Sequence, residues 1–460
     1  MTRSMRPICG AATIALAFAW LAGATPATAQ SAEPAPQQGP VASPAPPPAP
    51  VDAAQPDAPA PDNGPATDIF SRNTLSALVD ARLVVADGAR SFVNGGLGKT
   101  RFQGNADGGY KARLIPAEAD IIWEPRFTRS LSANVSAGWQ RDHGFDLYEA
   151  FLNYLPQTSS NVSFSARAGL MWPEISLEHS TGGAWSVVNT ITPSAINSWV
   201  GEEAKVVGVE GTLHLNLGQH LLSATGGVFG FNDTSGTLLS FRGWALHDIK
   251  ATAVAHFPLP PLNTFISELQ QNETRSTIDV DKHVGFYGRL DWRPPWPFGV
   301  AVFYYDNRGN PQAFFPTGQW GWRTRFWNVG INADLGPNTK LLAQGMSGST
   351  IMGFDENGVP WVHTFFRSAY AMVVQQVGKV AVSGRVEAFG TREHGSEMMP
   401  DNSEDGWALT VAARMNLTNN LTAFAEALNV RSRRGARVEL VGLAPFEAQT
   451  VFQLALRLRI

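Results

Sequence analysis

The sequence predicts an all-β fold, a transmembrane antiparallel β-barrel of about 16 strands with short periplasmic turns and long extracellular loops. Three observations carry this prediction. Apolar and polar residues alternate with a period of two along most of residues 67–460, short and long links follow one another between the alternating segments, and an export signal opens the chain. Alternation lets one face of each strand meet lipid while the other meets a polar lumen.

The first 29 residues have the composition of a signal peptide. Arg3 and Arg6 precede an apolar run over residues 11–24, and Ala27-Thr28-Ala29 supplies the small residues that precede cleavage before Gln30. A membrane anchor is the alternative, but the run is shorter than the roughly 20 apolar residues that a spanning helix needs. We therefore expect an exported chain in the outer membrane of a Gram-negative cell.

Residues 30–66 are rich in proline and alanine and predict a disordered tether, because such a tract cannot bury a core. A plain spacer is favoured over a segment with its own partner. The formal net charge of −4 becomes −6 once Arg3 and Arg6 are removed, which argues against nucleic acid as a partner. Cys9 is the only cysteine and lies in the signal peptide, so the mature chain has no disulfide or cysteine ligand.

The barrel itself is predicted over residues 67–460. The alternating segments, in order, are 75–86, 110–124, 130–142, 145–155, 160–172, 204–217, 219–231, 283–293, 298–306, 323–335, 339–346, 363–377, 379–390, 406–417, 421–431 and 446–460. The last one is typical: Leu454, Leu456 and Leu458 share one parity and should face lipid, while Arg457 and Arg459 should face the lumen. Aromatic residues near strand ends predict interfacial girdles: Trp123, Trp139, Tyr148, Tyr154, Trp172, Trp292, Tyr304, Trp327 and Trp407.

The links between segments differ on the two sides of the predicted barrel. Short links rich in turn residues, such as "LGQ", "GPNT" and "VGK", follow the even-numbered segments. The others are long, except at 143–144: 87–109, 173–203, 232–282, 307–322, 347–362, 391–405 and 432–445. Within 232–282, apolar residues at helical spacing after Asn263 predict a short capped helix, which belongs either to packing within the loop or to a plug or receptor surface.

Three stretches, "TLLSFRGWALHD", "VAVFYYDNRGNP" and "GQWGWRTRFWNVGI", look like segments of Gram-negative porins. The chain resembles the sixteen-stranded class that includes the phosphate-selective porin O/P family. The resemblance implies a channel for small hydrophilic solutes in outer-membrane lipid, commonly a homotrimer. Two features depart from it: the chain ends in Ile460 where an aromatic residue is usual, and it has 7 lysines against 28 arginines where phosphate-selective members use a lysine ladder.

Charged residues on the inward parity are the candidate pore lining. They are Arg167, Arg289, Arg367, Arg385, Arg414, Asp120, Glu149, Glu210, Asp291 and Glu387. Arg367, Arg385 and Arg414 come from consecutive segments and could form one basic wall that favours anions. The alternative is that acids neutralise these arginines as structural ion pairs. Loop 173–203 is the candidate constriction, because it carries acids that could oppose the arginines: Glu174, Glu178, Glu202 and Glu203.

These features predict passive diffusion of small hydrophilic solutes, with a preference for anions if the arginines are free. Two alternatives stay open: a closed outer-membrane barrel whose long loops bind a surface partner, and an outer-membrane barrel enzyme. The sequence contains no G-x-S-x-G elbow and no HExxH pair. We therefore expect no catalytic residue, metal or cofactor.

Overall fold

A computed structural model describes residues 67–156, 158, 160–180 and 184–460. The predicted signal peptide and tether lie outside the described residues. Among the residues described, no helix combines the length and the apolar character needed to cross a membrane.

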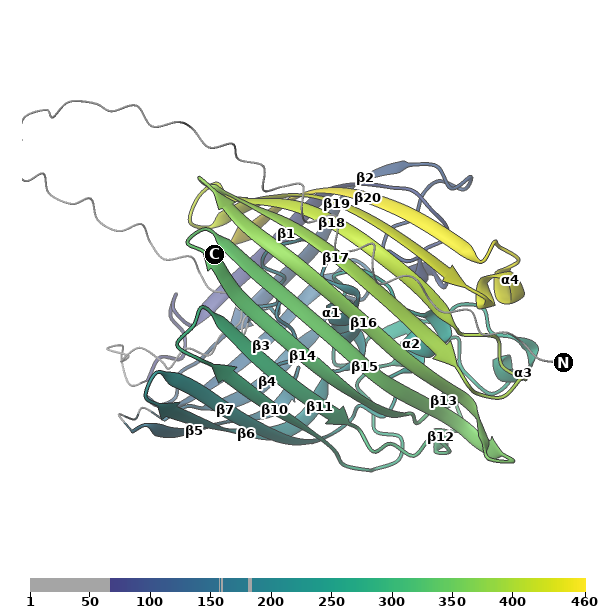
Figure 1. Cartoon of the computed structure of the whole chain (residues 1–460), viewed down its shortest axis with the longest axis horizontal. Helices are drawn as coiled ribbons and strands as arrows, with labels where there is room; N and C mark the ends of the chain where they lie inside the picture. Colours follow the sequence, from purple (N-terminus) through teal and green to yellow (C-terminus); the bar gives the residue numbers. More distant parts are fainter. Residues whose placement is uncertain (1–66, 157, 159, 181–183) are drawn as a thin grey trace, which may run out of the picture. The chain divides into compact units, whose positions relative to one another are not determined.

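Sixteen antiparallel strands form a closed barrel, which confirms the predicted fold class (Figure 1). They are β1 (Leu75–Ala86), β2 (Lys111–Trp123), β3 (Leu131–Gln140), β4 (Gly144–Tyr154), β5 (Val162–Met171), β6 (Val206–Leu217), β7 (His220–Gly230), β10 (Gly285–Arg293), β11 (Phe298–Asp306), β14 (Arg323–Gly336), β15 (Thr339–Glu356), β16 (Val359–Val377), β17 (Val380–Glu393), β18 (Glu404–Asn416), β19 (Leu421–Arg434) and β20 (Phe446–Arg459). Two small sheets, β8 (His256–Pro258) with β9 (Glu273–Arg275) and β12 (Phe314–Phe315) with β13 (Gln319–Trp320), belong to long loops.

The first and last strands close the barrel. β1 pairs with β20 over nine residue pairs, from Leu78 with Arg459 to Ala86 with Val451. The backbone of Ile460 adds two further hydrogen bonds to Ala77, at 2.9 Å each. Pairing at both edges leaves no open strand in the wall, which is the condition for a sheet to stand in lipid.

One predicted long loop is wrong. Residues 347–362 form the outer part of a β-hairpin, in which β15 runs to Glu356 and β16 starts at Val359. The connecting residues, Asn357 and Gly358, both have positive φ, at 57° and 86°. An Asn-Gly pair with both residues in the left-handed region is the preferred two-residue hairpin turn, so this sequence signal was available and missed.

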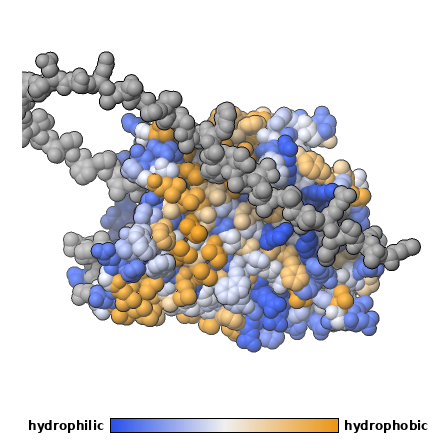
Figure 2. Space-filling view, in the orientation of Figure 1, coloured by the Kyte–Doolittle hydropathy of each residue, from blue (hydrophilic) through white to orange (hydrophobic). Residues whose placement is uncertain are grey.

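The two faces of the wall differ as the alternation predicts. Leu454 and Leu456 are 56% and 51% exposed on the outer face, whereas Arg457 turns inward and bonds to Asp80. In Figure 2 a band of apolar side chains crosses the near wall, with hydrophilic ones on either side of it. Outward aromatic residues contact each other across strands, as Tyr304 and Trp327 do with ring centroids 4.7 Å apart. Tyr148 and Trp172 are buried instead, so the girdle prediction is wrong for these two.

Short helices lie in the long connections: η1 (Phe92–Asn94), α1 (Ala195–Glu203), α2 (Thr237–Arg242), α3 (Thr264–Ser267) and α4 (Ala436–Val441). The predicted cap of α3 is confirmed, because the Asn263 side chain accepts a hydrogen bond from the backbone N–H of Ile266 at 3.1 Å. Figure 1 shows α1 and α2 between the strands of the barrel. These two helices therefore define the region in which a pore would run.

We expect Leu456→Arg to prevent assembly of the barrel in the outer membrane. An arginine on the outward face costs roughly 2–4 kcal/mol near the lipid midplane and less near the interface. Ala448→Arg is the matched control, because Ala448 is exposed on the same face of β20 but pairs with Arg431, near the loop end. Outer-membrane levels of the folded, heat-modifiable form check this; equal levels of both variants would contradict the assigned lipid face.

Candidate functional site

Two long connections fill the space inside the barrel. We call residues 172–205, which contain α1, the inner loop, and residues 231–284, which contain α2, the second loop. Every residue of α1 and of α2 is buried. Trp199 of α1 packs against Phe326 of β14 and Phe366 of β16, with ring centroids 5.3 Å apart in both cases. The loops are thus part of the packed interior and not a cover above it.

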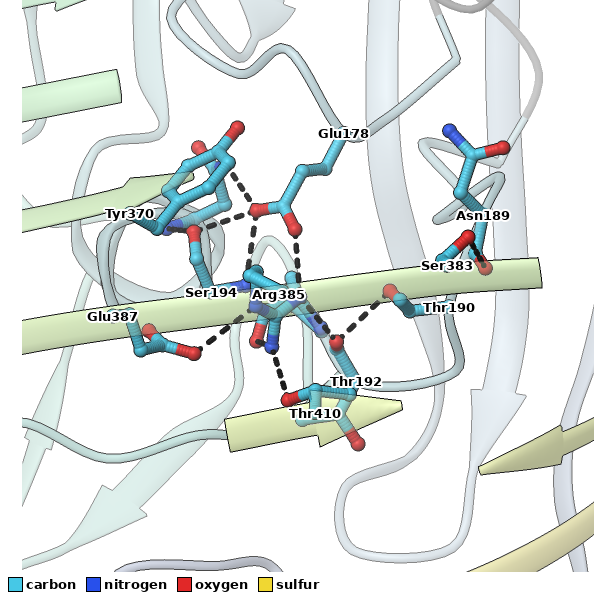
Figure 3. A network of polar contacts seen from close by, with 12 residues as sticks. Glu178, Asn189, Thr190, Thr192, Ser194, Tyr370, Ser383, Arg385, Glu387 and Thr410 are labelled. Atoms are coloured by element: carbon cyan, nitrogen blue, oxygen red, sulfur yellow. Dashed lines mark hydrogen bonds and ion pairs between the residues drawn. The ribbon is translucent and has the colours of Figure 1, made fainter. Parts of the chain in front are cut away.

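Arg385 on β17 is the polar centre of the contact between the inner loop and the wall (Figure 3). Its guanidinium donates to Glu387, Glu178, the carbonyls of Thr192 and Pro193, and the Thr410 hydroxyl, over 2.7–3.2 Å. These five bonds use all five N–H donors of the side chain. Glu178 also accepts from Ser194 and Asn197, so the same carboxylate fixes the start of α1. Arg385 is fully buried and ion-paired on both sides.

Wall side chains also hold the backbone of the inner loop. Glu387 accepts from the N–H of Ala195 at 2.7 Å, and Glu426 on β19 accepts from those of Ile191 and Thr192 at 2.6 and 3.0 Å. Ala195 is the first residue of α1, where a backbone donor lacks a partner within the helix, and Ile191 and Thr192 lie in the segment before it. Carboxylates on two strands therefore supply acceptors for these three N–H groups.

The other inward arginines are also engaged. Arg167 bonds to Glu210 at 2.6 Å, and Glu210 accepts a second bond from the Tyr287 hydroxyl. Arg289 pairs with Asp291 at 2.6 Å and also donates to the carbonyl of Glu174. Arg167 is neutralised across neighbouring strands, β5 and β6, whereas Arg289 is neutralised by an acid two residues further along the same strand, β10.

Arg414 differs from Arg167, Arg289 and Arg385. It is half-buried and donates to the carbonyl of Val188 at 3.3 Å. No carboxylate pairs with it among the described residues. Arg414 is thus the predicted wall arginine whose charge is not neutralised by a carboxylate.

The inward orientation predicted for Arg367 is wrong. On β16 the buried positions include Phe366, Ser368 and Tyr370, whereas Arg367 is exposed between Phe365 and Ala369 on the outer face. Parity alone could not reveal this, because β16 carries large apolar residues on both faces. The three arginines of consecutive strands therefore do not form one wall.

The remaining predicted acids contact loops. Asp120 lies 3.5 Å from the ammonium of Lys250, and Glu149 accepts from the N–H of Trp172 at 3.2 Å. Glu174 lies at the edge of the inner loop, 3.7 Å from Arg167.

Glu202 and Glu203 join the two loops. Burial raises the pKa of Glu202, but Arg242 and His247 outweigh it and lower the pKa to about 2. Burial raises the pKa of Glu203 to about 7, although the backbone N–H of Leu238, in the first turn of α2, opposes that rise. The predicted constriction acids thus act in different places, with Glu178 at the wall and this pair between α1 and α2.

Anchors of the second loop escaped the sequence analysis. Asp248 bridges Arg82 of β1 at 2.7 Å and Arg101 at 3.0 Å, and Lys250 bonds to Glu118 of β2. Asp248 and Lys250 lie in a long link without periodicity, so only their charge could have marked them.

One small cavity lies between the inner loop and the wall. A cavity of about 30 Å³ lies between Leu177 of the inner loop and the wall formed by β10, β11 and β14, with room for on the order of two water molecules. Its lining residues are Leu177, Arg289, Asp291, Trp292, Arg293, Gly299, Val300, Ala301, Gly330 and Asn332. The lining is mixed in polarity and opens on the side of the short turns.

One group of carboxylates could hold a cation. Asp233, Asp279 and Asp281 each offer an oxygen, and these atoms lie within 4.8 Å of one another. Asp233 already accepts bonds from the backbone N–H groups of Val280 and Asp281. Clustered acids occur without ions, and we assign no metal to this group.

Solved structures share this architecture. The outer membrane channel DcaP of Acinetobacter baumannii matches with a TM-score of 0.52 at 7% identity, over 86% of this chain and 98% of that chain. The fold is that of an outer-membrane porin-like barrel. An anion-selective porin from Comamonas acidovorans matches with a TM-score of 0.46 at 11% identity, over 84% of this chain and 99% of that chain. A loop-deletion mutant of OmpT from Vibrio cholerae matches with a TM-score of 0.47 at 8% identity, over 84% of this chain and 99% of that chain. No family model and no curated protein sequence matches the chain.

We expect Arg385→Gln to lower the free energy of unfolding by about 3–5 kcal/mol, because it leaves Glu178 and Glu387 buried without their cation. Arg323→Gln is the control, since Arg323 is exposed and lies 3.9 Å from Asp306, a pair worth at most about 1 kcal/mol. Urea unfolding of the folded barrel in lipid checks both. Equal unfolding midpoints for the two variants would show that the network does not hold the inner loop.

Proposed function

We propose that this protein is a narrow outer-membrane channel for the passive diffusion of small hydrophilic solutes, constricted by the inner loop. The observation that carries the proposal is the anchoring of residues 172–205 inside a sixteen-stranded barrel by polar and charged wall residues. A polar path through a closed barrel lowers the cost of crossing the apolar bilayer, and the loop sets its width. The chain then needs no catalytic residue, and we propose no enzymatic activity for it.

The surroundings of the barrel form part of the same proposal. We place the protein in outer-membrane lipid, after export directed by residues 1–29, with residues 30–66 as a tether. The apolar outward face supports this location. A homotrimer is the assembly that the porin resemblance suggests, and chemical cross-linking in outer membranes tests it.

The charge selectivity follows from which lumenal cations are free. Arg167, Arg289 and Arg385 each face a carboxylate, so their fields are largely cancelled within the wall. Among the described residues, Arg414 and Arg113 each have a backbone carbonyl and no carboxylate as partner, and an anion preference would depend on such side chains. We therefore propose a weak preference for anions, stronger at low salt, where charges act over longer distances.

A second candidate is a closed barrel whose loops bind a surface partner. The complete burial of α1 and α2 favours it, because packed helices leave little open path. The two candidates differ in conduction: a constricted channel passes ions steadily, and a closed barrel does not. In the channel, loosening the inner loop widens an existing path.

We expect the double variant Glu387→Ala/Glu426→Ala to show a larger single-channel conductance in planar bilayers than the wild type. Both carboxylates accept hydrogen bonds from the backbone of the inner loop, so their removal frees the segment just before α1. Conductance and reversal potential in a salt gradient are measured for the double variant and for the wild type.

The control is Glu397→Ala/Glu439→Ala, which removes two exposed acids from loops and should conduct as the wild type does. Equal conductance of the wild type and Glu387→Ala/Glu426→Ala would show that the inner loop is not the constriction. Absence of any conductance in the wild type would favour the closed barrel.

A further inference from the structure

The outward arginines of the barrel are confined to one sector of the wall. They are Arg323 and Arg325 on β14, Arg367 on β16, Arg392 on β17, and Arg431 and Arg433 on β19. We call these six residues the arginine patch. On β1 to β7, β10 and β11, every described arginine or lysine within a barrel strand turns inward, as Arg82, Arg167 and Arg289 do. The patch is therefore a local feature and not a property of the whole rim.

The strand register makes the patch continuous across this sector. Trp327, Ser347, Arg367, Gly390, Asp405 and Arg433 form one continuous row of paired residues from β14 to β19. Arg367 is paired with Ser347 and Gly390, which have a small side chain and none, and it is exposed. From β14 to β19 the row spans five strand spacings, about 24 Å.

Aromatic residues mark the depth of the patch. Along β14, the outward residues run from Arg323 and Arg325 through Trp327 to Val329. Arg431 lies over the Trp407 ring, 5.3 Å from its centroid. Tryptophan prefers the boundary between acyl chains and headgroups, so arginines next to it on the loop side stand among the headgroups.

The patch has a surplus of positive charge. Arg392 pairs with Asp405 at 2.7 Å, and Arg323 lies 3.9 Å from Asp306. No carboxylate pairs with Arg325, Arg367 or Arg433 among the described residues. A guanidinium facing headgroups is suited to two parallel hydrogen bonds with a phosphate.

We propose that the arginine patch binds the phosphate groups of outer-leaflet lipid. A second copy of the chain fits less well: below the tip of the β15–β16 hairpin, the outward acids on described barrel strands are Asp306 and Asp405, and both already lie near arginines. The described strands of a neighbouring barrel wall thus offer no unpaired carboxylate to this patch, whereas a phosphorylated headgroup offers phosphate oxygens. The inference rests on the proposed outer-membrane location but not on conduction.

The test titrates detergent-solubilised full-length mature protein with bis-phosphorylated lipid A and with the same lipid lacking its phosphates, read by native mass spectrometry. The variant is Arg325→Gln/Arg367→Gln/Arg433→Gln. Each basic residue near a lipid surface contributes about 1 kcal/mol, or about fivefold in affinity, so the triple change should weaken binding of the phosphorylated lipid roughly 100-fold. The wild type should bind the dephosphorylated lipid weakly.

The matched control is Arg72→Gln/Arg129→Gln/Lys379→Gln, which removes three exposed charges at the end with the short turns and should bind as the wild type does. A lysine version of the triple variant keeps the charge without paired hydrogen bonds and should lose less affinity. The heat-modifiable gel shift shows that each variant is folded, and conductance should be unchanged.

Three results would overturn the proposal: equal affinity for the two lipids, equal loss in the control variant, or displacement of the lipid by millimolar inorganic phosphate, which would indicate a site for free anions. A change of oligomeric state in the triple variant without loss of lipid would instead make the patch an interface between copies.

Discussion

The pairing of β1 with β20 is the constraint on which the rest of this structure depends. It joins residues from opposite ends of the barrel sequence, such as Val79 with Leu458, and leaves no strand edge unpaired. A closed wall separates two environments, so each strand must satisfy an apolar outside and a polar inside at alternate positions. The inward charges and the outward arginines have meaning only with respect to that wall.

Within the wall, ion pairs serve to hold loops. Arg385 contacts two carboxylates and two loop carbonyls, and Glu426 receives two loop N–H groups. A buried charge is tolerable only when its partners are present, so each of these residues ties the inner loop to one position. In the proposed channel the wall thereby sets the width of the path through the position of the inner loop. The charges that suggest ion selectivity in the sequence mainly stabilise the structure.

The two faces of the barrel use arginine differently. Arg385 is buried and has all its donors satisfied inside the protein, whereas Arg367, one strand away, is exposed on the outer face without a carboxylate partner. The first kind fixes an internal loop, and the second is the kind that we propose to bind lipid phosphate. A position one residue along a strand changes the environment of the side chain completely.

The sequence by itself determined the fold class, the sixteen strands, nearly all their bounds and the side on which most links are long, because alternation and turn residues are local signals. It also nominated Glu178 and Arg385. Only the tertiary structure decided that these two meet, that Asp248 and Lys250 anchor a second loop, and that Arg367 points outward. Such contacts join residues far apart in the chain or depend on strand parity where both faces are apolar, as on β16, and no local pattern encodes either.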